Sequence, residues 1–143
     1  MAELYDHDFY GWIQEQAALL KEGRLSVIDV EHLVEELEGM GRSERRELVN
    51  RLAVLLAHLL KWRRQPERRG SSWRAAITEQ RYRVQERLDE SPSLQHDIDE
   101  SMARAYRYVI LQAVRETGLD ENSFSDRCPC TLAQALAHDF WPD

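Results

Sequence analysis

The stretch Leu48–Trp62, LVNRLAVLLAHLLKW, constrains the fold of this chain more than any other. It contains no Gly or Pro, and leucine, alanine and valine dominate it. Its apolar residues recur at α-helical spacing and form two neighbouring stripes. The stripes are Leu48, Leu52, Leu55 and Leu59, and Val49, Ala53, Leu56 and Leu60. Because a surface helix needs only one stripe, we expect this helix to be central, with other helices packed against several of its sides.

Start and stop signals predict further helices on both sides of this stretch. Gly39 and Gly41 are interpreted as the end of one helix, and Ser43 as the start of the central helix, which Pro66 ends. The other predicted helices run from Asp6 or Asp8 to about Glu22, from Asp29 to Met40, from Trp73 to about Asp89 with Ser71 or Ser72 as the cap, from Ser91-Pro92 to about Thr117 before the stop at Gly118, and from Thr131 to about Asp139.

These elements predict an all-α fold. No stretch alternates apolar and polar residues over a convincing length, so no strand is expected. The length of 143 residues suits one domain. We therefore predict a single-domain helical bundle over residues 1–143, with about five helices plus a short C-terminal helix. Near the end of the chain, four residues are too apolar for a free tail and should pack on the bundle or on a partner: Leu132, Leu136, Phe140 and Trp141.

Composition points to a cytoplasmic globular protein. No apolar run approaches the roughly 20 residues that a membrane helix needs, so no membrane is expected as a partner. The first residues, MAELYDHDFYGW, lack the basic and then apolar pattern of a secretory signal. Cys128 and Cys130 are too close in sequence for an ordinary bridge, and we expect both to be reduced thiols.

Charge is distributed unevenly around the net value of −7. Residues 61–87 carry nine basic and three acidic side chains, whereas the segments before and after them are acidic. Trp62 and Trp73 lie among these cations, a composition that suits nucleic acid. Both tryptophans fall on apolar helical positions, however, so we expect the cations to pair with the Glu-rich second helix or the acidic termini. The candidate basic surface comprises Lys61, Arg63, Arg64, Arg68, Arg69 and Arg74.

Several polar residues fall on or beside otherwise apolar stripes. Buried polar groups must find partners, so such residues predict one shared network, which either fixes helix packing or lines a small pocket. The candidate polar cluster comprises Glu36, His58, Gln80, Arg81 and Tyr106, with Gln16 nearby on its own stripe.

Two groups of residues were weighed as metal ligands. His32-x-x-Glu35-Glu36 places an imidazole and a carboxylate one helical turn apart, but the Glu-x-x-His pairs of di-iron bundles are absent. Cys128, Cys130 and His138 offer three soft ligands where structural zinc takes four. We therefore expect no metal and no cofactor.

A set of short motifs runs along almost the whole chain. The motifs are Tyr5-Asp6-x-Asp8-Phe9-Tyr10-x-Trp12, Leu19-Leu20-x-x-Gly23-Arg24, Asp29-x-Glu31-His32-Leu33-x-Glu35-Glu36-Leu37-Glu38-x-Met40-Gly41, His58-Leu59-Leu60-Lys61-Trp62-x-x-Gln65-Pro66, Ser72-Trp73, Gln80-Arg81, Ser91-Pro92-Ser93-Leu94, Glu116-Thr117-Gly118-Leu119, Cys128-Pro129 and Asp139-Phe140-Trp141-Pro142. Together they resemble the bacterial family called domain of unknown function 29. The resemblance implies an α-helical fold and supplies no activity, substrate or catalytic residue. Cys130 departs from the family pattern, which has a large residue after Cys-Pro.

Three functions remain open from the sequence. The leading hypothesis is a non-enzymatic protein-interaction module that binds another protein or itself through an apolar helix face and the C-terminal segment. One alternative is an enzyme or a binder of small ligands or metals, with a pocket near Glu36, His58 and Arg81. The other is nucleic-acid binding through residues 61–74.

Overall fold

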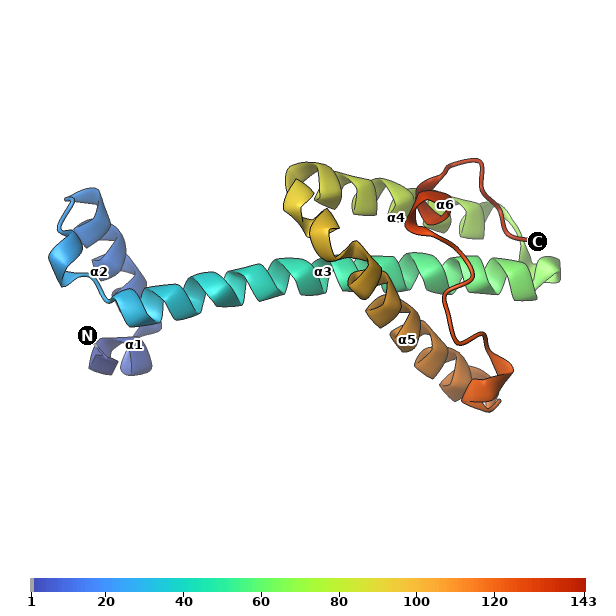
Figure 1. The fold of residues 1–143 in the computed structure, drawn as a ribbon, viewed down its shortest axis with the longest axis horizontal. Coiled ribbons are helices and arrows are strands. Elements are labelled where there is room, and N and C mark those ends of the chain that lie inside the picture. Colours follow the sequence, from blue (N-terminus) through green and yellow to red (C-terminus); the bar gives the residue numbers. More distant parts are fainter. Residues whose placement is uncertain (1) are drawn as a thin grey trace. The chain divides into compact units, whose positions relative to one another are not determined.

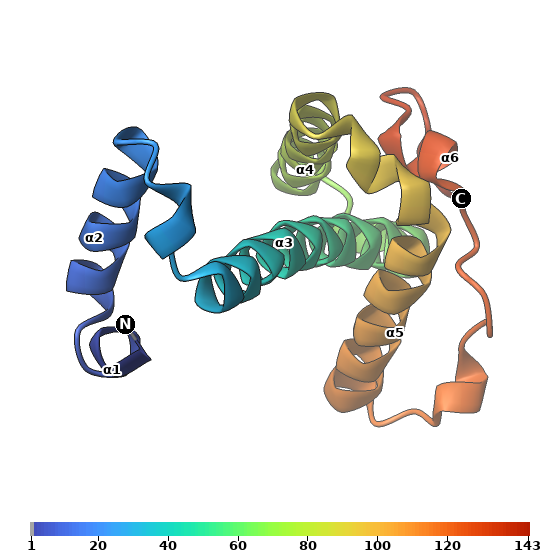
Figure 2. The same cartoon turned by 60° about the vertical axis from the view of Figure 1, so that its left-hand side comes forward.

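The computed structural model describes residues 2–143, with side chains from residue 4 onward, and it is α-helical (Figures 1 and 2). Within these residues there is no strand, which confirms the predicted fold class. The α-helices are α1 (Ala2–His7), α2 (Phe9–Lys21), α3 (Val30–Arg64), α4 (Ser71–Glu90), α5 (Ile98–Thr117) and α6 (Leu132–Leu136). Short 3-10 helices join them: η1 (Leu25–Val27), η2 (Pro66–Arg68), η3 (Pro92–Asp97) and η4 (Glu121–Ser123).

The chain divides into two compact units, Met1–Ser43 and Glu44–Asp143. We call them the first unit and the second unit. The first unit holds α1, α2, η1 and the start of α3, and the second holds the rest of α3 and all later elements. A single domain over residues 1–143 stays a prediction.

The second unit is built around the leucine-rich part of α3, as predicted. Leu48, Leu52 and Leu55 are completely buried. Helices α4 and α5 and the residues after them surround this part of α3 (Figures 1 and 2). The residues that bury it come from α4 (Ile77, Val84 and Leu88), from α5 (Met102, Ala105, Tyr106, Val109 and Ile110) and from the C-terminal segment (Phe124 and Ala135).

The end of the chain packs back onto the second unit, which confirms one of the two placements that its apolar character predicted. Leu132, Leu136 and Trp141 contact the core. The ring of Trp141 lies 4.8 Å from that of Trp62, centroid to centroid. The C-terminal segment is therefore part of the hydrophobic core of this unit.

Most predicted helix ends are confirmed because their signals are local. Asp8 caps α2 by accepting a hydrogen bond from the backbone N–H of Gly11 at 3.0 Å. Helix α3 ends at Arg64, just before Pro66. Gly118 ends α5 with φ of +74°, a left-handed conformation that glycine adopts without strain. Thr131 starts α6 with a reciprocal capping box.

One predicted helix end and two predicted starts are wrong. Helix α6 ends at Leu136, before the predicted end at about Asp139. Ser91-Pro92 begins the 3-10 helix η3, and α5 starts only at Ile98. The helix after the loop begins at Ser71 with Gly70 as its N-cap and no side-chain cap. In both places a Ser supplied a start signal, but its hydroxyl does not hold the first turn of an α-helix.

The predicted break at Gly39 and Gly41 is also wrong, because α3 is one helix from Val30 to Arg64. A glycine inside a helix costs about 1 kcal/mol relative to alanine. That cost ends a helix only where a proline or a left-handed residue accompanies it. Neither glycine has a positive φ, and the residues around them are mostly good helix formers such as Leu, Glu, Met and Arg.

We predict that Gly41→Ala stabilises the protein by about 0.5–1 kcal/mol, because alanine restricts the unfolded chain and suits the helix. Nothing in the described structure lies within 4 Å of the added Cβ. Thermal unfolding followed by circular dichroism measures the change. Gly118→Ala is the matched control and should destabilise, because its φ is positive. Destabilisation by Gly41→Ala would contradict a continuous α3.

Candidate interaction surfaces

The residues of the predicted polar cluster have separate partners. Glu36 lies in the first unit, where the hydroxyl of Tyr5 donates to its Oε1 at 2.5 Å. The other four members lie in the second unit. His58 is half-buried, with its Nδ1 2.8 Å from the carbonyl oxygen of Val54 in its own helix. Gln80 has a buried Oε1 without a partner among the described residues. Whether any of these residues forms a binding site stays a prediction.

Arg81 joins α4 to the C-terminal segment. Its side chain is only 1% exposed, and its Nε donates to the carbonyl oxygen of Ala135 at 2.7 Å. Its Nη2 donates to the carbonyl oxygen of Phe140 at 2.5 Å, and its guanidinium lies 5.1 Å from the ring centroid of Trp141. Burial lowers the pKa of Arg81, while the nearby Asp139 opposes that shift. These contacts assign Arg81 a structural task in the second unit.

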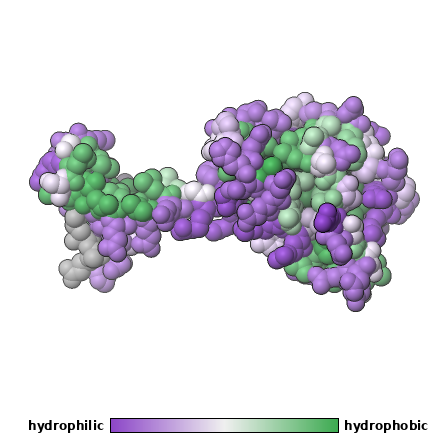
Figure 3. All heavy atoms as spheres, in the orientation of Figure 1, coloured by the Kyte–Doolittle hydropathy of each residue, from purple (hydrophilic) through white to green (hydrophobic). Residues whose placement is uncertain are grey.

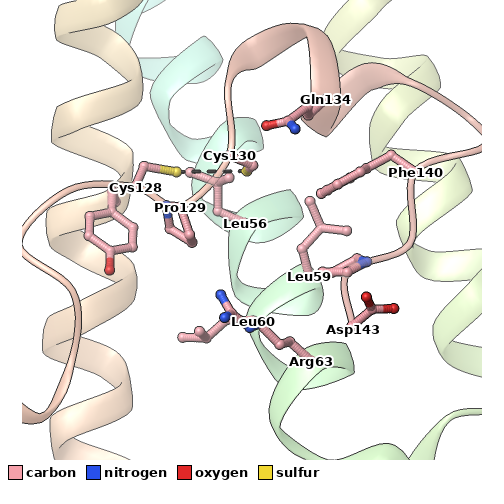
Figure 4. A pocket seen from close by; sticks show the side chains of 12 residues that line it. Leu56, Leu59, Leu60, Arg63, Cys128, Pro129, Cys130, Gln134, Phe140 and Asp143 are labelled. Atoms are coloured by element: carbon pink, nitrogen blue, oxygen red, sulfur yellow. Dashed lines mark hydrogen bonds between the residues drawn. The ribbon is translucent and has the colours of Figure 1, made fainter.

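Tyr106 fixes the segment that follows α5. Its hydroxyl donates to the carbonyl oxygen of Ser125 at 2.8 Å, and burial raises its pKa. It also lines a cavity of about 260 Å³ in the second unit, together with Leu59, Cys128 and Cys130 (Figure 4). Tyr106 is the member of the predicted polar cluster that borders this cavity.

Asp29 is the centre of a polar network in the first unit that sequence reasoning missed. Its Oδ2 accepts a hydrogen bond from the indole Nε1 of Trp12 at 3.0 Å and lies 2.8 Å from the Nδ1 of His32. Its backbone N–H donates to the Oε1 of the buried Gln16 at 2.8 Å. The ring of Tyr5 stacks on that of His32, with centroids 3.9 Å apart. Asp29 also caps α3, as predicted. The Asp-x-x-His spacing at the start of this helix is the sequence signal that could have indicated the contact with His32.

These contacts shift the ionisation of three side chains. The hydrogen bond with Asp29 raises the pKa of His32, against the effect of burial. Burial tends to raise the pKa of Asp29, but the hydrogen bonds from His32 and Trp12 lower it further than burial raises it. The hydrogen bond to Glu36 raises the pKa of Tyr5 to about 12. The first unit thus relies on charged and aromatic contacts, with Trp12 as its fully buried aromatic residue.

The first unit exposes many large apolar side chains, and we call the surface that they form the apolar face. At 100° per residue, its members on α3 fall within an arc of about 120°. Leu37 is 64% exposed there, and Tyr10 on α2 is 70% exposed. Figure 3 shows hydrophobic side chains gathered on this unit. We define the apolar face by the large apolar residues of this unit that remain exposed: Val30, Val34, Leu37 and Met40 on α3, Phe9, Tyr10, Ile13 and Leu20 on α2, and Leu25 and Val27 on η1.

Acidic side chains border the apolar face on α3. Glu31 and Glu38 lie at one edge of the apolar arc, seven residues apart, and Glu35 lies just beyond them. All three are exposed, and within residues 4–43 none forms an ion pair. Residues 1–43 carry ten acidic and three basic side chains, a net charge of −7. The face is thus apolar at its centre and acidic at its rim.

The predicted basic surface lies on the second unit and packs against aromatic rings. The guanidinium of Arg64 lies 4.5 Å from the ring centroid of Phe124. That of Arg74 lies 5.0 Å from the rings of both Trp62 and Trp141. Arg69 donates from Nε to the carbonyl oxygen of Trp62 at 2.7 Å.

The six cations of this surface have no acidic side-chain partner within their own unit. In residues 44–143, the ion pairs involve other basic residues. Arg63, Arg64, Arg68 and Arg74 are exposed, and Lys61 and Arg69 are half-buried. Arg69 also donates from Nη2 to the carbonyl oxygen of Asp143 at 3.2 Å. Pairing of the six cations with the Glu-rich second helix or the acidic termini stays a prediction.

The described residues offer neither a metal-binding cluster nor a helix that could span a membrane. No group of three or more His, Cys, Asp or Glu side chains among them is arranged to hold a metal ion. No helix in residues 2–143 combines the length and the apolar character needed to cross a membrane. The cytoplasmic location stays a prediction.

Comparison with known families agrees with the helical fold and the motifs. The family model described as domain of unknown function DUF29 matches residues 4–141. The chain belongs to the DUF29 family. No curated protein and no solved structure matches this DUF29 chain. The family assignment supplies no activity for this chain.

We predict that Arg81→Met lowers the free energy of unfolding by about 2–4 kcal/mol, because it leaves the carbonyl oxygens of Ala135 and Phe140 buried without a donor. Urea unfolding measures the loss, and limited proteolysis should cut the C-terminal segment faster. Arg83→Met is the control, since Arg83 is exposed on the same helix and should change stability by less than about 0.5 kcal/mol. Equal effects of the two changes would argue against the structural task of Arg81.

We predict that His32 titrates above its ordinary pKa of 6.5 and that Asp29→Asn returns the midpoint toward that value. The sign follows from linkage: a raised folded-state pKa stabilises the protein below pH 6.5, and this contribution is lost as pH rises through the raised value. NMR titration of the His32 ring protons measures the midpoint.

Asparagine still caps a helix, so Asp29→Asn removes the carboxylate while keeping the cap. Asp8→Asn makes the same change at the cap of α2 and should leave the His32 midpoint unchanged. A wild-type midpoint at or below 6.5 would contradict the Asp29–His32 contact.

Proposed function

We propose that this DUF29 chain is a protein-interaction module that binds a second copy of itself. The apolar face of the first unit, with its acidic rim, docks on the basic surface of the second unit of the other copy. The observation that carries this proposal is the pair of surfaces: they are opposite in charge, and the charged side chains of neither surface form an ion pair within their own unit.

The apolar face supplies the hydrophobic part of the binding energy. Exposed apolar patches larger than a few hundred Å² mark interaction sites on soluble proteins. Ten large apolar side chains on one small unit are enough for such a patch, and burying apolar area contributes about 25 cal/mol per Å². The partner surface offers apolar contacts as well, because the rings of Trp73 and Trp141 are only half-buried there.

Charge selects the orientation. Two first units placed face to face would bring a net charge of −7 against another −7. Residues 61–74 carry six cations and one acidic side chain, Glu67, so the same acidic rim is attracted to them. In a twofold dimer each copy contributes one acidic face and one basic surface, which gives two equivalent interfaces.

The aromatic contacts of the arginines favour this docking. A guanidinium that stacks on a ring keeps its N–H groups available at its edge. Arg64 on Phe124 and Arg74 on Trp62 and Trp141 are already restricted by these contacts. They therefore lose less side-chain entropy when they pair with a carboxylate.

A charge-swap experiment tests the proposal. We expect the wild-type chain to run as a dimer in light scattering after size exclusion, and to dissociate as salt is raised. The triple change Glu31→Lys, Glu35→Lys and Glu38→Lys should weaken the dimer by more than about tenfold, and so should Arg63→Glu, Arg64→Glu and Arg68→Glu. An equimolar mixture of the two variants should recover the dimer, because both interfaces regain opposite charges.

Matched controls separate this interface from general charge effects. Glu86→Lys, Asp89→Lys and Glu90→Lys change three exposed acidic residues on α4 and should leave dimerisation intact. Leu37→Ser should weaken the dimer, whereas Tyr82→Ser, equally exposed on the second unit, should not. A monomeric wild type at high protein concentration, or a mixture that stays monomeric, would overturn self-association. A dimer that persists in both triple variants would place the contact elsewhere.

A further inference from the structure

The two thiols of the chain face one another in the second unit. Cys128 Sγ and Cys130 Sγ are 3.8 Å apart, and the two side chains point toward each other across Pro129 (Figure 4). Both are half-buried. Both border the cavity of about 260 Å³ and a second cavity of about 890 Å³, so small molecules have space to approach them.

The segment that holds these thiols is fixed at both of its ends. Before it, the side chain of Phe124 is buried in the core, and the carbonyl oxygen of Ser125 accepts the hydrogen bond from Tyr106. After it, Thr131 makes the capping box of α6. The proline ring restricts the backbone between the thiols. Folding therefore already holds the two sulfurs close together, so little further conformational entropy is lost when they react.

The two thiols differ in ionisation. The hydrogen bond from Cys130 lowers the pKa of Cys128 to about 7, against the effect of burial. The same contact raises the pKa of Cys130, and burial adds to that shift. The lowered pKa favours the thiolate of Cys128, the form that attacks disulfides, while the raised pKa favours the protonated form of Cys130.

We propose that Cys128 and Cys130 form a redox-active dithiol that exchanges with small disulfides such as oxidised glutathione. The thiolate of Cys128 attacks one sulfur of the small disulfide, forms a mixed disulfide and releases one thiolate. Cys130 then gives up its proton to solvent, and its sulfur attacks the sulfur of Cys128 and releases the second thiolate. The net reaction oxidises the protein dithiol by two electrons to an intramolecular disulfide and reduces the small disulfide to two thiols.

The geometry requires only a short movement. A disulfide bond is about 2.05 Å long, so the sulfurs must approach by about 1.8 Å from their present separation. A bridge across a single residue is not an ordinary structural disulfide, and strained bridges are the labile ones that take part in redox exchange.

Reaction of the reduced, folded chain with oxidised glutathione tests the proposal, with intact-protein mass spectrometry as the readout. The wild type should lose two hydrogens and carry no glutathione. Cys130→Ser should stop at one glutathione bound to Cys128, because the resolving thiol is gone. Cys128→Ser should likewise form no intramolecular disulfide and should take up at most one glutathione, at Cys130. The pH dependence of the reaction rate gives the midpoint of the Cys128 titration. In Cys130→Ser this midpoint should be higher than in the wild type, because the hydrogen bond with Cys130 no longer lowers the pKa of Cys128.

Circular dichroism of both variants checks that each is folded, and the same reaction in concentrated urea supplies the contrast. In urea the wild type should accumulate glutathione adducts, since the folded segment no longer holds the two sulfurs together. A folded wild type that accumulates glutathione adducts, stays reduced in excess oxidised glutathione, or forms disulfides between molecules would overturn the proposal.

Discussion

Burial of the leucine face of α3 is the contact on which the second unit depends. Leu48, Leu52 and Leu55 are completely removed from solvent, and α4 and α5 meet on them. Burying a leucine contributes about 1.5–3 kcal/mol. In its last turn the same helix carries Trp62, which contacts Trp141 from the end of the chain and two arginine side chains. One helix therefore supplies both the hydrophobic centre of the unit and the platform for its cationic surface.

The first unit is held together by different physical terms. Trp12 and Gln16 are its fully buried side chains, and most of its large apolar residues remain exposed. Its cohesion comes from the hydrogen bonds around Asp29 and from the stacked rings of Tyr5 and His32. Contacts of this kind respond to pH and salt more than apolar packing does. This unit therefore combines a large uncovered apolar surface with a high negative charge.

The parts of this fold that local chemistry determines were predictable from the sequence. The all-α class, the central helix, the cap at Asp8, the stop at Gly118 and the capping box at Thr131 each depend on neighbouring residues. Gly39 and Gly41 misled the prediction because helix propensity is a weak preference that the rest of a long helix overrides.

The candidate sites were less predictable because their partners are distant in sequence. Arg81 bonds to residues 54 and 59 positions away, and Tyr5 bonds to Glu36, 31 positions away. The sequence indicated which polar residues lie on apolar stripes, but the pattern within a helix contains no information about what lies opposite. The stacking of Arg64 on Phe124 depends likewise on how the C-terminal segment folds back. These contacts belong to the tertiary structure.

The bonds of Arg81 also set an order in which the second unit can form during synthesis. When α4 leaves the ribosome, the guanidinium of Arg81 has no acceptor, because Ala135 and Phe140 are translated more than fifty residues later. Until then, burying that charge is unfavourable, and the side chain must stay in contact with water. Arg81 therefore reaches its buried position only after the C-terminal segment has emerged, so docking of that segment is a late event in the life of the nascent chain.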